Sequence, residues 1–197
     1  MTLRFICLAL LLLPAPLHAG QRPPAVPLQT GGSVIAFETS LGTIQVKLFV
    51  KEAPRTTGAI LALVRRGFYA GTLFHRVIPG FMIQGGGLDA SLTTKIAGPA
   101  VPNEADHGLK NRRGTVALAR AADPHSGSAQ FFVNLVDSPN LDHRDRTDAG
   151  WGYCVFGEVI LGMDVVDAIA RVPTGTRSPH ANVPVTDVVI KRAWVVR

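Results

Sequence analysis

Two stretches of the sequence, residues 74–86 and 119–134, hold most of the side chains whose types and spacing could do chemistry. The second stretch includes Asp123, His125 and Ser126, the residue types with which serine hydrolases cleave acyl bonds. No serine lies in the Gly-x-Ser-x-Gly turn that exposes such a nucleophile, and the phosphate-cradling Gly-x-x-x-x-Gly-Lys-Ser/Thr motif does not occur. Neither hydrolysis nor nucleotide chemistry is therefore indicated.

Acidic, histidine and arginine side chains also gather in the segment 142–152. Their spacing matches no metal site with defined ligand positions, and the remaining histidines are dispersed along the chain. We therefore expect a solvated loop whose charges pair with one another, and no metal.

The first stretch places Arg76 in a strand-like run that leads to Phe81 and Met82. Taken singly, these residues have ordinary explanations, because an isolated arginine is usually a solvated surface charge and large apolar residues usually belong to a core. His75 is expected to be a packed histidine with a satisfied ring rather than a proton carrier. Only the whole block is specific enough to indicate a function.

That block, residues 74–86 (FHRVIPGFMIQGG), resembles the signature of the cyclophilin family. Three further blocks follow in the family's order: 114–120 (GTVALAR), 128–134 (SAQFFVN) and 155–159 (VFGEV). The similarity spans roughly residues 33–197 and is closest to the periplasmic bacterial branch, which shares Ala119-Arg120 and Asp123-Pro124.

The resemblance implies a peptidyl-prolyl cis-trans isomerase (EC 5.2.1.8) that binds X-Pro peptides in a groove. Arg76 is then the first candidate for catalysis, with Gln84 orienting it or binding the substrate carbonyl and Phe81 beside them. The implied substrate-binding residues are Met82, Ala119, Arg120, Gln130, Phe132, Leu141 and Tyr153. No cofactor is implied, since rotation about the X-Pro bond breaks no covalent bond.

A binding module is the alternative from another class, in which the groove holds proline-containing or unfolded segments as a chaperone or scaffold with little turnover. The intact set of Arg76, Phe81, Gln84 and Phe132 favours the enzyme. A nucleic-acid binder would rest on the net charge of +6 alone. The basic residues are scattered, with no long run and no interleaved aromatic ladder, so we expect no nucleic-acid partner.

The elements that must position these residues are mostly short strands. The apolar patterns predict strands over 34–39, 43–49, 73–77, 81–84, 115–119, 131–134, 155–159 and 187–196. One helix should begin at Pro54 and end at Gly67, and a second should cover 163–171. The predicted fold class is mainly β: a closed eight-stranded antiparallel barrel, cyclophilin-like, capped by two α-helices.

The first nineteen residues are typical of a secretory signal peptide, because a charged start, an apolar run to Leu13 and small residues up to Ala19 follow in order. Residues 20–32 should form a flexible leader, and 33–197 the isomerase domain. The apolar run is too short to span a bilayer. We therefore expect a periplasmic monomer without stable membrane insertion, whose partners are proline-containing peptides and unfolded exported proteins.

Two cysteines are present, and Cys7 lies in the signal segment. Cys154 would then be the only thiol of the mature chain, which excludes an internal disulfide. It lies in an apolar stretch and is expected to be a small buried residue.

Overall fold

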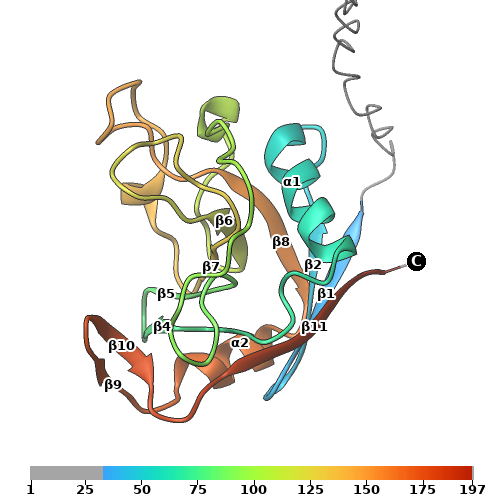
Figure 1. The fold of residues 1–197 in the computed structure, drawn as a ribbon. Helices are drawn as coiled ribbons and strands as arrows, with labels where there is room; N and C mark the ends of the chain where they lie inside the picture. Colours follow the sequence, from blue (N-terminus) through green and yellow to red (C-terminus); the bar gives the residue numbers. More distant parts are fainter. Residues whose placement is uncertain (1–32, 197) are drawn as a thin grey trace, which may run out of the picture.

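The computed structural model describes residues 33–196, so the predicted signal peptide and the whole of the predicted leader, residues 20–32, lie outside the described residues. The fold is mainly β, with nine strands in one curled antiparallel sheet and two α-helices at opposite ends of it (Figure 1). The sheet order is β3-β11-β1-β2-β8-β6-β7-β5-β4. Its strands are β1 (Val34–Thr39), β2 (Gly42–Leu48), β3 (Thr72–Leu73), β4 (Arg76–Ile78), β5 (Met82–Gly85), β6 (Thr115–Leu118), β7 (Phe131–Asn134), β8 (Val155–Leu161) and β11 (Val189–Val196).

The predicted closed eight-stranded barrel is wrong, because the sheet is a half-barrel whose edge strands β3 and β4 do not pair. The single strand expected over 73–77 is split: Leu73 ends β3 and Arg76 begins β4, with only Phe74 and His75 between them. Two strands that run end to end in one chain segment cannot form a ladder side by side. Leu73 makes two backbone hydrogen bonds past the end of β5 instead, to Gly86 at 3.1 Å and to Leu88 at 2.8 Å.

The other predicted elements match the structure closely. α1 (Pro54–Arg65) has Pro at its start, and Gly67 follows its end with a φ of 69°. The Gly67 and Phe68 amides donate to the Val64 and Leu63 carbonyls, which is the Schellman ending that a left-handed glycine permits. α2 (Met163–Ala170) lies where the apolar spacing placed it.

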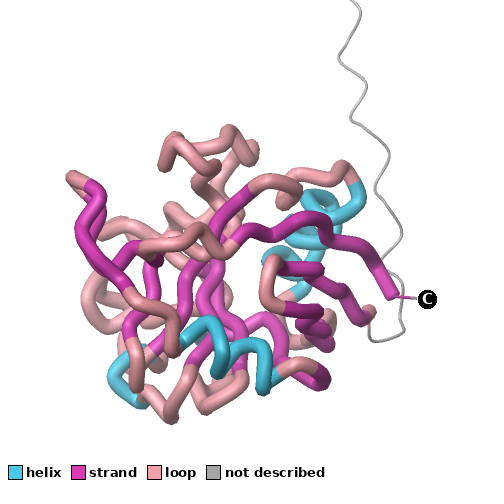
Figure 2. Tube along the Cα trace, turned by 90° about the horizontal axis from the view of Figure 1, so that it is seen from below, coloured by secondary structure: helices cyan, strands magenta, loops and turns pink. Residues whose placement is uncertain are grey.

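A small hairpin, β9 (Thr174–Arg177) paired with β10 (His180–Pro184), was not predicted. Its residues are mostly exposed and polar, so they lack the apolar alternation that indicates a strand. Two short 3-10 helices, η1 (Ala105–His107) and η2 (Pro139–Leu141), were also missed. Figure 2 shows the hairpin projecting from the body of the molecule.

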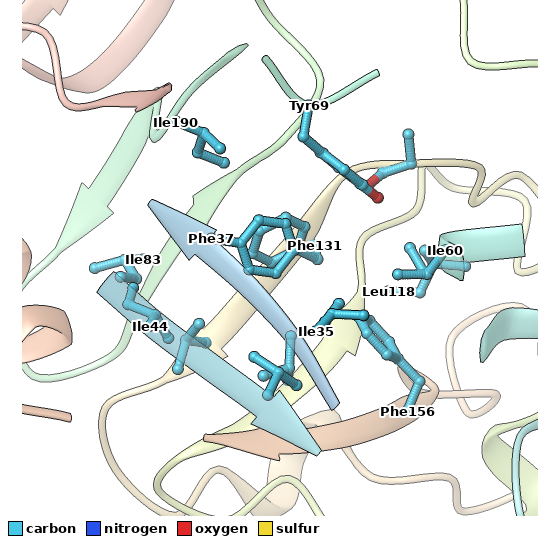
Figure 3. Packing of buried hydrophobic residues seen from close by; sticks show 14 of the residues in the cluster. Ile35, Phe37, Ile44, Ile60, Tyr69, Ile83, Leu118, Phe131, Phe156 and Ile190 are labelled. Carbon is cyan, nitrogen blue, oxygen red and sulfur yellow. The ribbon is translucent and has the colours of Figure 1, made fainter. Parts of the chain in front are cut away.

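The core fills the curl of the sheet and is built around aromatic rings (Figure 3). Phe37 stacks on Phe131 with ring centroids 4.9 Å apart, and Tyr69 meets both rings edge-on. A second, smaller buried cluster contains Met82 and Phe132. Since neighbouring residues of a strand point to opposite faces, β7 places Phe131 in the main core and Phe132 in the second cluster. No helix within residues 33–196 is long and apolar enough to cross a membrane.

Candidate active site

A hollow of about 240 Å³ opens over the second cluster, and we call it the proline pocket after the role that the resemblance implies. Nine of the ten predicted site residues line it: Arg76, Phe81, Met82, Gln84, Ala119, Arg120, Phe132, Leu141 and Tyr153. The tenth, Gln130, lines an adjoining hollow of about 310 Å³, which shares Gln84, Ala119 and Arg120 with the pocket. The structure thus brings together residues from three of the four sequence blocks, together with Leu141 and Tyr153.

The pocket floor is apolar and well supported. Met82 and Phe132 are almost fully buried, while Phe81, Leu141 and Tyr153 are partly buried around them. The Phe132 ring meets the Tyr153 ring edge-on, with centroids 5.4 Å apart. Such a floor suits a small apolar ring such as the side chain of proline.

Arg76 lies at the rim, on edge strand β4, directly opposite Gln84 of β5. An Arg76 Nη1 donates to the Gln84 Oε1 at 3.5 Å, and the Gln84 Nε2 donates to the Gln130 Oε1 at 2.9 Å. Among residues 33–196, no carboxylate lies within ion-pairing distance of Arg76. The guanidinium therefore has no ion-pair partner among these residues and is oriented by a neutral side chain.

The two glutamines depend on a close approach of the chain at Gly87. A Cβ at position 87 would overlap the Cγ of Gln130. Glycine at this position therefore gives the Gln130 side chain the room from which it reaches Gln84. Gly87, which directly follows the block 74–86, thus has a packing role beside the pocket.

Arg120 contributes far more than the backbone pairing that the sequence suggested. Its side chain donates to the carbonyls of Ala121, Ala122, Asp148 and Gly152 at 3.0 to 3.1 Å. The guanidinium carbon also lies 4.8 Å from the centre of the Tyr153 ring. Arg120 therefore links the segment 119–122 to the loop 142–152 by hydrogen bonds and stabilises one side of the pocket.

Asn111 is a supporting residue that sequence reasoning missed. Its Nδ2 donates to the Leu141 carbonyl at 3.1 Å, and its backbone N–H donates to the Asp142 carboxylate at 2.8 Å. The Tyr153 N–H donates to the Leu141 carbonyl at 2.9 Å. Asn111 thereby fixes the backbone under two pocket residues, although nothing in its local sequence marks it.

The loop 142–152 is only partly self-paired, in contrast to the prediction. Asp145 accepts hydrogen bonds from the Thr147 amide and hydroxyl within the loop. Arg146 instead pairs with Asp106 at 3.6 Å, and the Trp151 indole donates to the Asn103 carbonyl at 3.2 Å. In the described part of the chain, no three His, Cys, Asp or Glu residues are grouped so as to hold a metal ion.

Cys154 is a packed core residue, as expected, with only 1% of its surface exposed. Burial raises the pKa of its thiol to about 11, so it stays protonated at neutral pH. The nearby His107 ring lies 2.8 Å from the Val155 carbonyl through Nε2, and its Nδ1 accepts from the Leu109 amide. The His107 Nε2 also lies 3.7 Å from the Cys154 Sγ, but because Nδ1 accepts a hydrogen bond, Nε2 is the protonated nitrogen of the neutral ring and cannot take a proton from the thiol.

The comparison with known families decides the identity of the fold. A model of the family "Cyclophilin type peptidyl-prolyl cis-trans isomerase/CLD" matches residues 34–195. The chain belongs to this family. The expected resemblance and the expected enzyme class, a peptidyl-prolyl cis-trans isomerase, are both confirmed.

Two of the similar curated isomerases are bacterial and are covered over nearly their full length. Peptidyl-prolyl cis-trans isomerase B of Escherichia coli is 49% identical over 82% of this chain and 99% of its own. Peptidyl-prolyl cis-trans isomerase cyp18 of Streptomyces antibioticus is 50% identical over 83% of this chain and 99% of its own. A crystal structure of a cyclophilin from Cryptosporidium parvum has a TM-score of 0.71 at 28% identity and covers 85% of this chain and 99% of that one.

Proposed function

We propose that this cyclophilin accelerates X-Pro rotation in unfolded exported proteins of the bacterial envelope, with Arg76 as the catalytic residue. The observation that carries the catalytic assignment is the position of Arg76: an unneutralised guanidinium at the rim of an apolar pocket. The bacterial relatives and the charged, apolar, small order of residues 1–19 support export. On this proposal residues 20–32 are a leader and 33–197 a monomeric catalytic domain.

Catalysis needs only a device that weakens amide resonance and a pocket that holds the twisted bond. The barrier to rotation is about 18–20 kcal/mol, because the nitrogen lone pair is shared with the carbonyl. As the bond twists, the lone pair localises on the prolyl nitrogen, where the Arg76 guanidinium can donate a hydrogen bond to it. This interaction is stronger in the twisted state than in the planar one, which is the condition for catalysis.

The other site residues bind and orient. Gln84 aims Arg76, and Gln130 in turn orients Gln84. Phe81, Met82, Phe132, Leu141 and Tyr153 hold the proline ring. The Ala119 N–H already donates to the Gln130 carbonyl at 2.9 Å, so pairing with the substrate backbone falls to the main chain of Arg120.

The test is the cis-to-trans conversion of a short Ala-Pro peptide by wild type, Arg76→Ala and Arg76→Lys. We expect Arg76→Ala to lower kcat/KM by about 100- to 1,000-fold, the usual cost of losing one transition-state donor. Arg76→Lys should recover little, because an ammonium cannot keep the planar contact with Gln84. Arg76 is exposed, so both variants should unfold at the wild-type temperature.

Two results would contradict the proposal in different ways. Full activity of a folded Arg76→Ala variant would remove Arg76 from catalysis. A wild-type protein that binds several X-Pro peptides without converting them would favour the chaperone or scaffold alternative and leave only the fold.

A further inference from the structure

A third hollow, of about 390 Å³, lies between α1 and the segment 97–102, outside the proline pocket. On the helix it is lined by one face, at spacings of three and four residues that include Ala59, Ala62 and Leu63. Pro99, Val101 and Pro102 line the facing segment. The lining is therefore largely apolar, and the small side chains of α1 leave the space open.

The α1 hollow is continuous with the substrate site. Ser128 lines both the α1 hollow and the adjoining hollow that holds Gln130. That adjoining hollow shares Gln84 and Arg120 with the proline pocket. The Val101 amide donates to the Gly127 carbonyl at 2.8 Å, which fixes the lining segment of the α1 hollow beside Ser128. The three hollows thus follow one another as a single trough.

The α1 hollow carries positive charge at both ends. Arg55 and Arg66 line it and stand eleven positions apart, about 16 Å along a helix. Within residues 33–196 neither guanidinium has a carboxylate within ion-pairing distance, and α1 contains no acidic residue. Arg66 donates to the Ala97 carbonyl, which leaves its charge in place. The Glu104 carboxylate lies at the start of α1, where it accepts hydrogen bonds from the Arg55 and Thr56 amides.

We propose that the α1 hollow extends the substrate trough and takes an apolar segment of the same client polypeptide, flanked by acidic residues. An extended chain advances about 3.3 Å per residue, so carboxylates about five residues apart would meet Arg55 and Arg66. The inference rests on the proposed function, because the client is the chain whose X-Pro bond lies in the proline pocket. Binding in the α1 hollow would make the protein prefer clients with an apolar segment between acidic residues, a preference that the proline pocket alone does not impose.

The test compares a short Ala-Pro peptide with longer peptides in which the same unit is extended by a leucine- and alanine-rich segment. The extension carries two glutamates about five residues apart, or two lysines in their place, and is attached on either side of the Ala-Pro unit. We expect one glutamate peptide to bind at least about tenfold tighter than the short peptide, and its lysine counterpart to lose this gain.

Ala62→Trp is the deciding variant, because Ala62 is exposed and an indole at this position fills the hollow. It should abolish the gain of the glutamate peptide and leave turnover of the short peptide unchanged. Ala181→Trp is the matched control, since Ala181 is exposed on β10 and lines none of the three hollows. It should keep the gain.

A glutamate peptide that binds no tighter than the short one, or a gain that survives Ala62→Trp, would overturn the inference. Failure of wild type to convert the short peptide would instead refute the proposed function. The two failures are separate, because peptide affinity is measured independently of turnover.

Discussion

His75 and Arg76 are adjacent in the sequence but lie in opposite environments. Arg76 is exposed at the pocket rim, whereas His75 is only 6% exposed. The expected packing of His75 is confirmed, while its Nδ1 has no hydrogen bond of ordinary geometry among the described residues. Burial is the main cause that lowers its pKa to about 4, and the charges of His180 and Arg76 act in the same direction.

This buried histidine predicts a loss of stability in mild acid. Between pH 6.5 and 4 the unfolded chain binds a proton at His75 while the folded chain does not, so the free energy of unfolding falls as the pH falls through this window. The loss should reach about 2 kcal/mol at pH 5. Urea unfolding of wild type and His75→Asn at pH 7 and pH 5 measures it. A variant with the same pH dependence as wild type would exclude His75 as the cause.

At the residue level, the sequence predicted which residues meet but not how they are held. Arg76, Gln84 and Phe132 lie in blocks whose family resemblance is specific, and the structure places them around one pocket. The supporting contacts of Asn111 and of the Arg120 side chain join residues far apart in the chain. Such contacts leave no local pattern, so the sequence could not indicate them.

Among the elements, the loop 142–152 depends on Arg120 for its position against the pocket. The guanidinium is shared among carbonyls of two segments and lies over the Tyr153 ring, which packs on Phe132. Arg120 is therefore a positioning residue whose side chain acts on substrate through Tyr153. Its four hydrogen bonds require the planar fork of an arginine.

We expect Arg120→Ala and Arg120→Lys to raise KM by about tenfold and to lower kcat much less, because neither the loop nor Tyr153 supplies the donor to the prolyl nitrogen. Arg144→Ala is the control from the same loop, since Arg144 makes one long side-chain hydrogen bond, 3.3 Å, to Ala149. Steady-state kinetics on one Ala-Pro peptide separates the two constants. A purely structural role would lower the unfolding temperature without changing KM.

The strand boundaries show where the apolar pattern of the sequence is enough to predict a strand. β1 and β7 were predicted to the residue, because each has a clear apolar run that ends at a polar residue, Thr39 or Asn134. The segment 73–77 has a continuous strand-like pattern, yet Phe74 and His75 carry the chain from one edge of the sheet to the other. Periodicity reports which residues are extended, but not which strand they pair with.

For the molecule as a whole, two consecutive residues of β7 face different sites: Phe131 lies in the main core and Phe132 in the cluster under the proline pocket. Phe131 is packed among Phe37, Tyr69 and Phe74 in the main core, whereas Phe132 lines the proline pocket. Phe131→Ala should lower the free energy of unfolding by about 3–5 kcal/mol, the cost of a large cavity. The activity per folded molecule should change little.

Phe132→Ala is the paired prediction: it should lower the kcat/KM of the folded enzyme, because it removes the ring proposed to contact proline, and it should also lower the free energy of unfolding, because Phe132 is only 4% exposed. Denaturant unfolding together with peptide conversion, measured on both variants under conditions where each is folded, tests the pair. Equal losses of activity per folded molecule would show that the two faces of β7 are not independent.

The last strand of the chain occupies an interior place in the sheet, and this has a consequence for how the protein is made. β11 lies between β3 and β1, and Val196 pairs with Val34. A ribosome delivers the amino-terminal strand first, so one edge of β1 stays open until β11 emerges. A nascent chain stalled short of β11 would therefore expose the unpaired edge of β1, along which other chains can pair.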